Sequence, residues 1–117
     1  MRNVEINIDN IGSDRVGNNL CLFGKMKLVE DETTTMTLNF DNFPCNLIFE
    51  TLALLEKMPF NKSDLIELPG IYMLYDGFAN KASFNKAMRN LFAIAIANIH
   101  TEFIDIDVKI KEEWEEA

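Results

Sequence analysis

The sequence predicts a single α+β domain: a mainly antiparallel sheet of four to five strands with two principal helices packed on one face. Apolar and polar residues alternate strictly in several segments, and two other segments carry apolar residues at helical spacing. Strands with one apolar face need a cover in water, and the two amphipathic helices are the available cover. The 117 residues suffice for one core and contain no linker-like stretch. We therefore expect one domain over residues 1–117, with 111–117 as a candidate acidic tail.

The first forty residues show the two-residue period of half-buried strands. Val4, Ile6 and Ile8 share one face of a strand predicted over residues 3–9. The polar, glycine-containing stretch 10–19 is expected to be a loop. Segments 20–29 and 35–40 alternate again and predict a hairpin joined by a charged turn. The other face of the sheet is expected to be polar and exposed.

The middle of the chain predicts a helix followed by shorter elements. Apolar residues at helical spacing stop before Pro59, and Asp41 or Asn42 can cap the start of this helix. Residues 61–68 are expected to form one helical turn, and the apolar run 70–75 a short strand.

The second helix is predicted over residues 81–100, with Asn80 as its cap. Lys81, Asn85 and Arg89 stand one turn apart and are expected on a solvent-facing side. Leu91–Ile99 is apolar nearly all round. Such a helix is either central to the fold or packed in a subunit interface.

A final strand is predicted over residues 102–110, where the alternation is as clean as in the first strand. Asp105 and Asp107 point the same way, with Cα atoms about 6.6 Å apart. A hard cation prefers about six oxygens, and acid–base chemistry needs two carboxyl pKa values pushed apart. The local sequence supplies neither condition. This pair is therefore read as solvated acids or as part of a protein-binding stripe.

Net charge and cysteine usage indicate in which compartment the protein is expected and which classes of partner it is expected to bind. The formal net charge is −8, and the basic segment 77–101 is followed by the strongly acidic segment 102–117. A negative field repels phosphate backbones, so we expect no direct binding to nucleic acid. No apolar run is long enough for a membrane span, and the first residues do not resemble a secretory signal. Cys21 and Cys45 form no C-x-x-C unit, which favours reduced thiols in the cytoplasm.

No residue pattern indicates catalysis, a cofactor or a metal. His100 is the only histidine, so a site with two or three histidine ligands is excluded. The loop from Gly12 to Gly17 lacks the lysine and the spacing of a phosphate-binding loop. We therefore expect no catalytic, cofactor-binding or metal-binding residues, and no enzyme.

The favoured function is that of a small acidic interaction protein. It would bind, and by that binding inhibit, a basic protein such as a nucleic-acid-handling enzyme, as phage-type inhibitors do through negative surface charge. The expected partner-binding residues are Asp105, Asp107, Glu112, Glu113, Trp114, Glu115 and Glu116. One alternative is a structural homo-oligomer, at least a homodimer, of phage or bacterial origin that pairs through Leu91–Ile99. Another is a small-ligand domain, a metal-binding domain or an enzyme.

Overall fold

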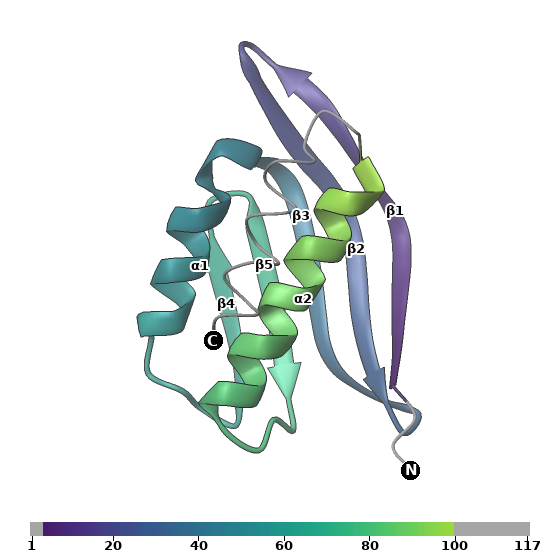
Figure 1. Ribbon diagram of the computed structural model, residues 1–117, viewed down its shortest axis with the longest axis vertical. Helices are drawn as coiled ribbons and strands as arrows, with labels where there is room; N and C mark the ends of the chain where they lie inside the picture. The colour runs from purple at the N-terminus through teal and green to yellow at the C-terminus, as the bar shows by residue number, and fades with distance from the viewer. Residues whose placement is uncertain (1–3, 100–117) are drawn as a thin grey trace.

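The computed structural model describes residues 4–99, which form a five-stranded antiparallel sheet with two helices packed on one face (Figure 1). The strands are β1 (Val4–Val16), β2 (Asn19–Glu30), β3 (Thr33–Pro44), β4 (Ser63–Leu68) and β5 (Ile71–Asp76). The helical elements are the short 3-10 turn η1 (Cys45–Leu47), α1 (Ile48–Lys57) and α2 (Lys81–Ile99). The sheet order is β1-β2-β3-β5-β4. The predicted fold class is confirmed, whereas the strand predicted over 102–110 lies outside the described residues.

The core lies between the helices and the alternate residues of the inner strands. Met26, Met36, Leu38 and Met73 are fully buried on the sheet side. Two aromatic clusters join the layers, one of Phe40, Phe43 and Phe92, and another in which the rings of Tyr75 and Phe84 lie 4.6 Å apart. Ring pairs at such separations stabilise a core beyond the apolar area that they bury.

The first strand continues to Val16, so the loop predicted over residues 10–19 is wrong except for its final turn. Residues 12–16 pair with residues 19–23 of β2, and this pairing supplies the hydrogen bonds that the polar sequence did not suggest. A bulge between Asp9 and Gly12 interrupts the ladder, and Asn10 there has a positive φ of 58°. Gly24 lies opposite, with φ of 111°, and a Cβ atom there would lie 2.4 Å from the Asn10 carbonyl oxygen. Only glycine fits this close approach.

The third strand runs to Pro44, so Asp41 and Asn42 lie within a strand and do not cap the first helix. Pairing decides this boundary, because Phe43 lies opposite Leu22 and is buried against the helices. Helix α1 ends at Lys57, before Pro59, as the sequence predicted.

The segment predicted as a helical turn over residues 61–68 contains strand β4. It pairs with β5 along its whole length, with Leu65 opposite Leu74 and Ile66 opposite Met73. The prediction failed because this pairing and the burial of Ile66 outweigh the local helical signals. The strand predicted over 70–75 is confirmed as β5, which begins one residue later at Ile71.

Helix α2 has the predicted cap, because the Ser83 backbone N–H donates to Asn80 Oδ1 over 2.9 Å. Leu91, Phe92, Ala93, Ala95 and Ile96 are buried, so the chain itself covers most of the apolar stretch at the end of α2. Its composition therefore gives no separate reason to expect a subunit interface.

The solvent-facing side predicted for α2 instead faces α1. Arg89 forms an ion pair with Glu56 of α1, and the Lys81 amine donates to the Met58 carbonyl oxygen. Asn85, between them, is half-buried, and its Oδ1 has no hydrogen-bond partner within residues 4–99. Periodicity places these residues on one side of the helix but does not say which neighbour that side meets.

Candidate protein-binding surface

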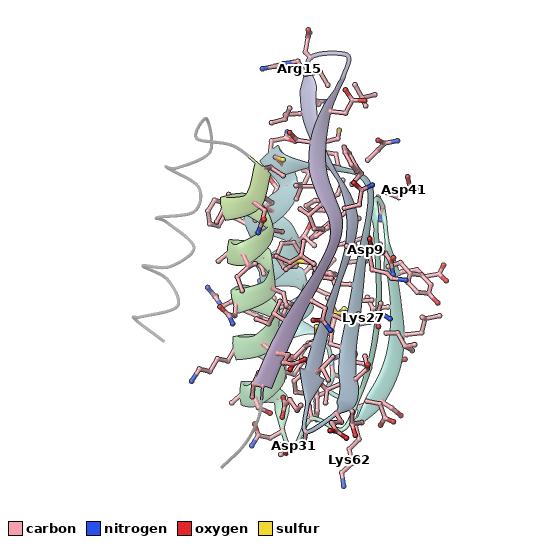
Figure 2. The ribbon with its side chains drawn as sticks, turned by 90° about the vertical axis from the view of Figure 1, so that its right-hand side faces the viewer. Asp9, Arg15, Lys27, Asp31, Asp41 and Lys62 are labelled. Atoms are coloured by element: carbon pink, nitrogen blue, oxygen red, sulfur yellow. The ribbon has the colours of Figure 1, made fainter. Side chains whose placement is uncertain are left out.

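The sheet face opposite the helices is left open by the described part of the chain. Figure 2 views the molecule along the layers, with the helices on one side and Asp9, Lys27 and Asp41 on the other. Antiparallel pairing aligns the outward residues in rows that cross all five strands. From β1 to β4, one row is Asp9, Lys25, Asn39, Tyr72 and Glu67, and the next is Asn7, Lys27, Thr37, Leu74 and Leu65. The face thus carries lysines on β2 and a different chemistry on β5 and β4.

Large apolar side chains lie exposed on the β4 and β5 part of this face. The exposed fractions are 44% for Leu65, 42% for Tyr72 and 49% for Leu74. Leu65 and Leu74 are directly opposite partners, so their side chains lie side by side. The prediction of a polar open face therefore fails on these two strands, because β5 is apolar at both odd and even positions.

A shallow hollow of about 260 Å³ adjoins Tyr72. The carboxylates of Asp41 and Glu67, the amide of Asn39 and the phenol ring of Tyr72 line it, and Gly70 contributes backbone. Asp76 stands on the same face, two residues beyond Leu74. We call Asp41, Leu65, Glu67, Tyr72, Leu74 and Asp76 together the open-face patch. It combines three exposed apolar side chains with three carboxylates, and none of its members is positively charged.

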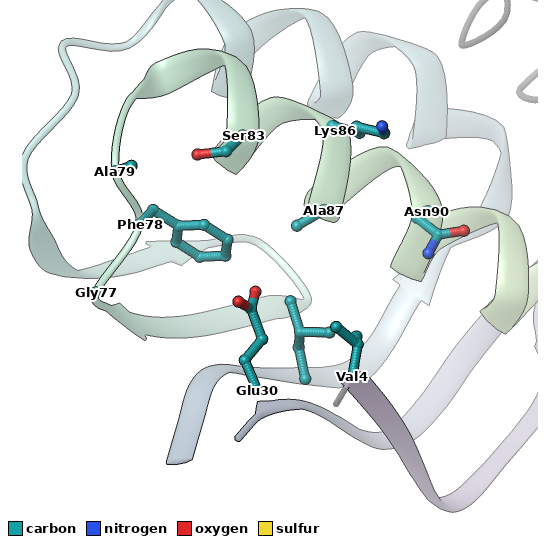
Figure 3. A pocket seen from close by; sticks show the side chains of 10 residues that line it. Val4, Glu30, Gly77, Phe78, Ala79, Ser83, Lys86, Ala87 and Asn90 are labelled. Atoms are coloured by element: carbon teal, nitrogen blue, oxygen red, sulfur yellow. The ribbon is translucent and has the colours of Figure 1, made fainter. Parts of the chain in front are cut away.

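A second cavity, of about 430 Å³, lies on the other side of the sheet between α2 and the ends of β1 and β2 (Figure 3). Its walls include the apolar side chains of Val4, Leu28 and Phe78. In Figure 3 the Glu30 carboxylate points from the sheet towards Phe78, whereas the Lys86 side chain extends along α2. No histidine or cysteine is among its described lining residues. This cavity offers an apolar surface with dispersed polar groups, among them Ser83, whose hydroxyl donates to the Asn80 carbonyl oxygen over 2.9 Å.

The described residues also supply no metal cluster and no activated thiol. Within residues 4–99, no group of three or more histidine, cysteine, aspartate or glutamate side chains could hold a metal ion. Cys21 and Cys45 are buried and free. Burial, with a smaller contribution from neighbouring Cys21, raises the pKa of the Cys45 thiol to about 11. A thiol with such a pKa stays protonated and is a poor nucleophile near neutral pH.

The residues that the sequence predicted for partner binding all lie outside the described residues. These are Asp105, Asp107, Glu112, Glu113, Trp114, Glu115 and Glu116, and the histidine at position 100 lies there too. The open-face patch was not predicted, although "IYMLYD" held a signal for it. A strand that is apolar on both faces and has a cover on only one must expose apolar side chains on the other.

Comparison with protein-family models, with curated proteins and with solved structures finds no match to this chain. Over the part that the structure describes, neither helix is long and apolar enough to cross a membrane.

Proposed function

We propose that this chain is a non-catalytic binding protein that docks a basic protein surface onto the open-face patch. The observation that supports this proposal is that exposed apolar side chains and carboxylates lie together on one face of the sheet. The apolar ones are Leu65, Tyr72 and Leu74, and the carboxylates are those of Asp41, Glu67 and Asp76. Exposed large apolar side chains that adjoin one another favour association, since covering them removes apolar area from water. The carboxylates select a partner of positive charge.

The hollow beside Tyr72 fits an arginine side chain of that partner. Glu67 and Asn39 lie directly opposite Tyr72 on its two neighbouring strands, so acceptor oxygens flank the ring. A guanidinium group stacks on an aromatic face and donates to carboxylates through its planar fork. Arginine is accordingly the residue through which we expect the partner to bind.

The rest of the open face directs where a basic partner can settle. Lys25 and Lys27 on β2 repel positive charge. They lie in the same cross-strand rows as Tyr72 and Leu74 and are separated from β5 by strand β3. The net charge of −8 attracts a basic protein from a distance. A nucleic-acid-handling protein fits this description, because its phosphate-binding site is a basic surface. Occupation of that site by acidic side chains would inhibit it.

A pair of matched leucine variants tests this proposal. Leu74 on the open face and Leu54 on α1 have the same exposed fraction, 49%. We expect Leu74→Arg to lower capture of one defined partner at least about tenfold, as loss of a central apolar contact does. Leu54→Arg should leave capture unchanged. The measurement is affinity capture from the native host with each variant, followed by quantitative mass spectrometry.

Salt dependence provides the second arm of the test. Binding that depends on carboxylates weakens as salt screens them, so the captured amount should fall steadily between 0.05 and 0.5 M salt, across which the screening length shrinks from roughly 14 to about 4 Å. Equal capture by the Leu74 and Leu54 variants, or capture that is indifferent to salt, would reject the proposal. Circular dichroism of both variants confirms that the fold is intact in each comparison.

A further inference from the structure

Among the described strands, β1 forms one edge of the sheet. Two of its apolar side chains lie on the helix-facing side of the sheet but remain exposed. Val4 and Ile8 face the helix side, yet 52% and 42% of their surfaces are exposed. By contrast, Met26, which lies opposite Ile8 on β2, is fully buried. An edge strand also presents unpaired backbone N–H and C=O groups, and residues 4–9 contain neither proline nor lysine to block pairing.

Helix α2 brings the chain to this edge. It contacts β1, and in Figure 1 it rises in the same direction as β1 and ends at Ile99 beside it. A segment that leaves α2 and turns back along β1 therefore runs antiparallel to β1 and needs only a short connection. The opposite edge, β4, is separated from β1 by three strands.

We propose that the free edge of β1 is the docking site for residues 102–110 of this same chain, which pair with it as an antiparallel strand. That segment lies outside the described residues. The alternation of the segment matches that of β1 in one register. Ile110 stands opposite Val4, Val108 opposite Ile6 and Ile106 opposite Ile8. These pairs place apolar area beside the exposed Val4 and Ile8 side chains.

Charge favours this register over its neighbour. The same alignment sets Lys109 opposite Glu5 and Asp107 opposite Asn7. Its one unfavourable row sets Asp105 opposite Asp9. A shift by two residues that sets Asp107 against Glu5 keeps the apolar parity but forms no pair of opposite charges. The opposite shift sets Asp107 against Asp9 and can pair Glu5 only with Lys111, which lies beyond the segment 102–110.

Engineered disulfides in the full chain test both the edge and the register. We expect the double variant Asn7→Cys, Asp107→Cys to form an intramolecular bond under mild oxidation, because directly opposite residues lie within disulfide reach. The control Asn7→Cys, Asp105→Cys is displaced by about 6.6 Å along the strand and should not form it. Peptide mapping identifies the bond and separates it from the buried thiols at positions 21 and 45.

Three results overturn the proposal: bonding in neither variant, preferential bonding in the control, or bonds between two copies of the chain. The last result would assign the edge to a second copy. Hydrogen exchange gives a measurement that does not depend on disulfide geometry. Ile106→Lys, at an inward position, should accelerate amide exchange in residues 4–9 about tenfold, whereas Asp107→Lys, at an outward position, should not. Equal exchange in the two variants would also overturn it.

Discussion

The two faces of strand β5 have similar composition and opposite surroundings. Ile71, Met73 and Tyr75 point towards the helices and are buried, while Tyr72 and Leu74 alternate with them and are exposed. All five are large and at least partly apolar, so residue type does not account for the difference. The difference arises because the helices cover one face of β5, whereas no described part of the chain covers the other. Apolar side chains on the open face contribute little to folding, which makes them available to a partner.

The largest effect expected from this comparison is on stability. Met73→Ala removes a fully buried side chain and leaves a cavity, so the free energy of unfolding should fall by about 2–5 kcal/mol. Leu74→Ala, one position along the same strand, should lower it by less than about 1 kcal/mol. Urea denaturation of both variants measures the difference. Similar losses would mean that the open face is covered in solution.

A smaller effect concerns ionisation on the covered side. Burial raises the pKa of the Cys45 thiol from 9.0 to about 11 in the folded protein. The contribution of this buried, neutral thiol to the free energy of unfolding is therefore fully present below pH 9 and is lost as the pH rises to about 11. The wild type should therefore lose more stability over this interval than Cys45→Ala does. Urea denaturation at pH 8, 9, 10 and 11 provides the test, and parallel curves for the two proteins would contradict it. In the native state, Cys45 should also resist alkylation by iodoacetamide at pH 7.

The smallest effect lies at the margin of the covered face, on the outermost strand. A hydrogen bond from Asn61, and a second from the Leu65 backbone N–H, lower the pKa of Asp64 below its ordinary value of 3.8. The carboxylate thus stabilises the fold above that pH, and its contribution disappears as the pH falls through the lowered pKa. Asp64→Asn should melt slightly below the wild type at pH 7 and converge with it on acidification. A difference that grows towards low pH would refute this assignment.

Local pattern was enough to predict the layers of the fold. Alternation predicted β2, a short apolar run predicted β5, and Asn80 with the helical spacing behind it predicted the start of α2. Pairing partners decided what local pattern missed. Residues 12–16 are mostly polar and contain a glycine, yet pairing with β2 keeps them in a strand, and β4 forms because β5 lies beside it.

The candidate site could not be predicted for a related reason. Glu67, Asn39 and Tyr72 come from three strands, and only the register across the sheet brings them into one row. Likewise, helical spacing grouped Lys81 with Arg89, but the position of α1 determined that they lie at a helix–helix contact.

The order of the strands has a consequence for synthesis on the ribosome. Strands β1 to β3 are consecutive in sequence and can pair soon after they emerge, yet α2, which contributes seven buried residues to the core, is made last among the described elements. At roughly 5–20 residues per second, the nascent three-stranded ribbon spends several seconds with Met26, Met36 and Leu38 open to water. Messages or variants that stop the chain before Leu91 should therefore yield aggregates and recruit chaperones.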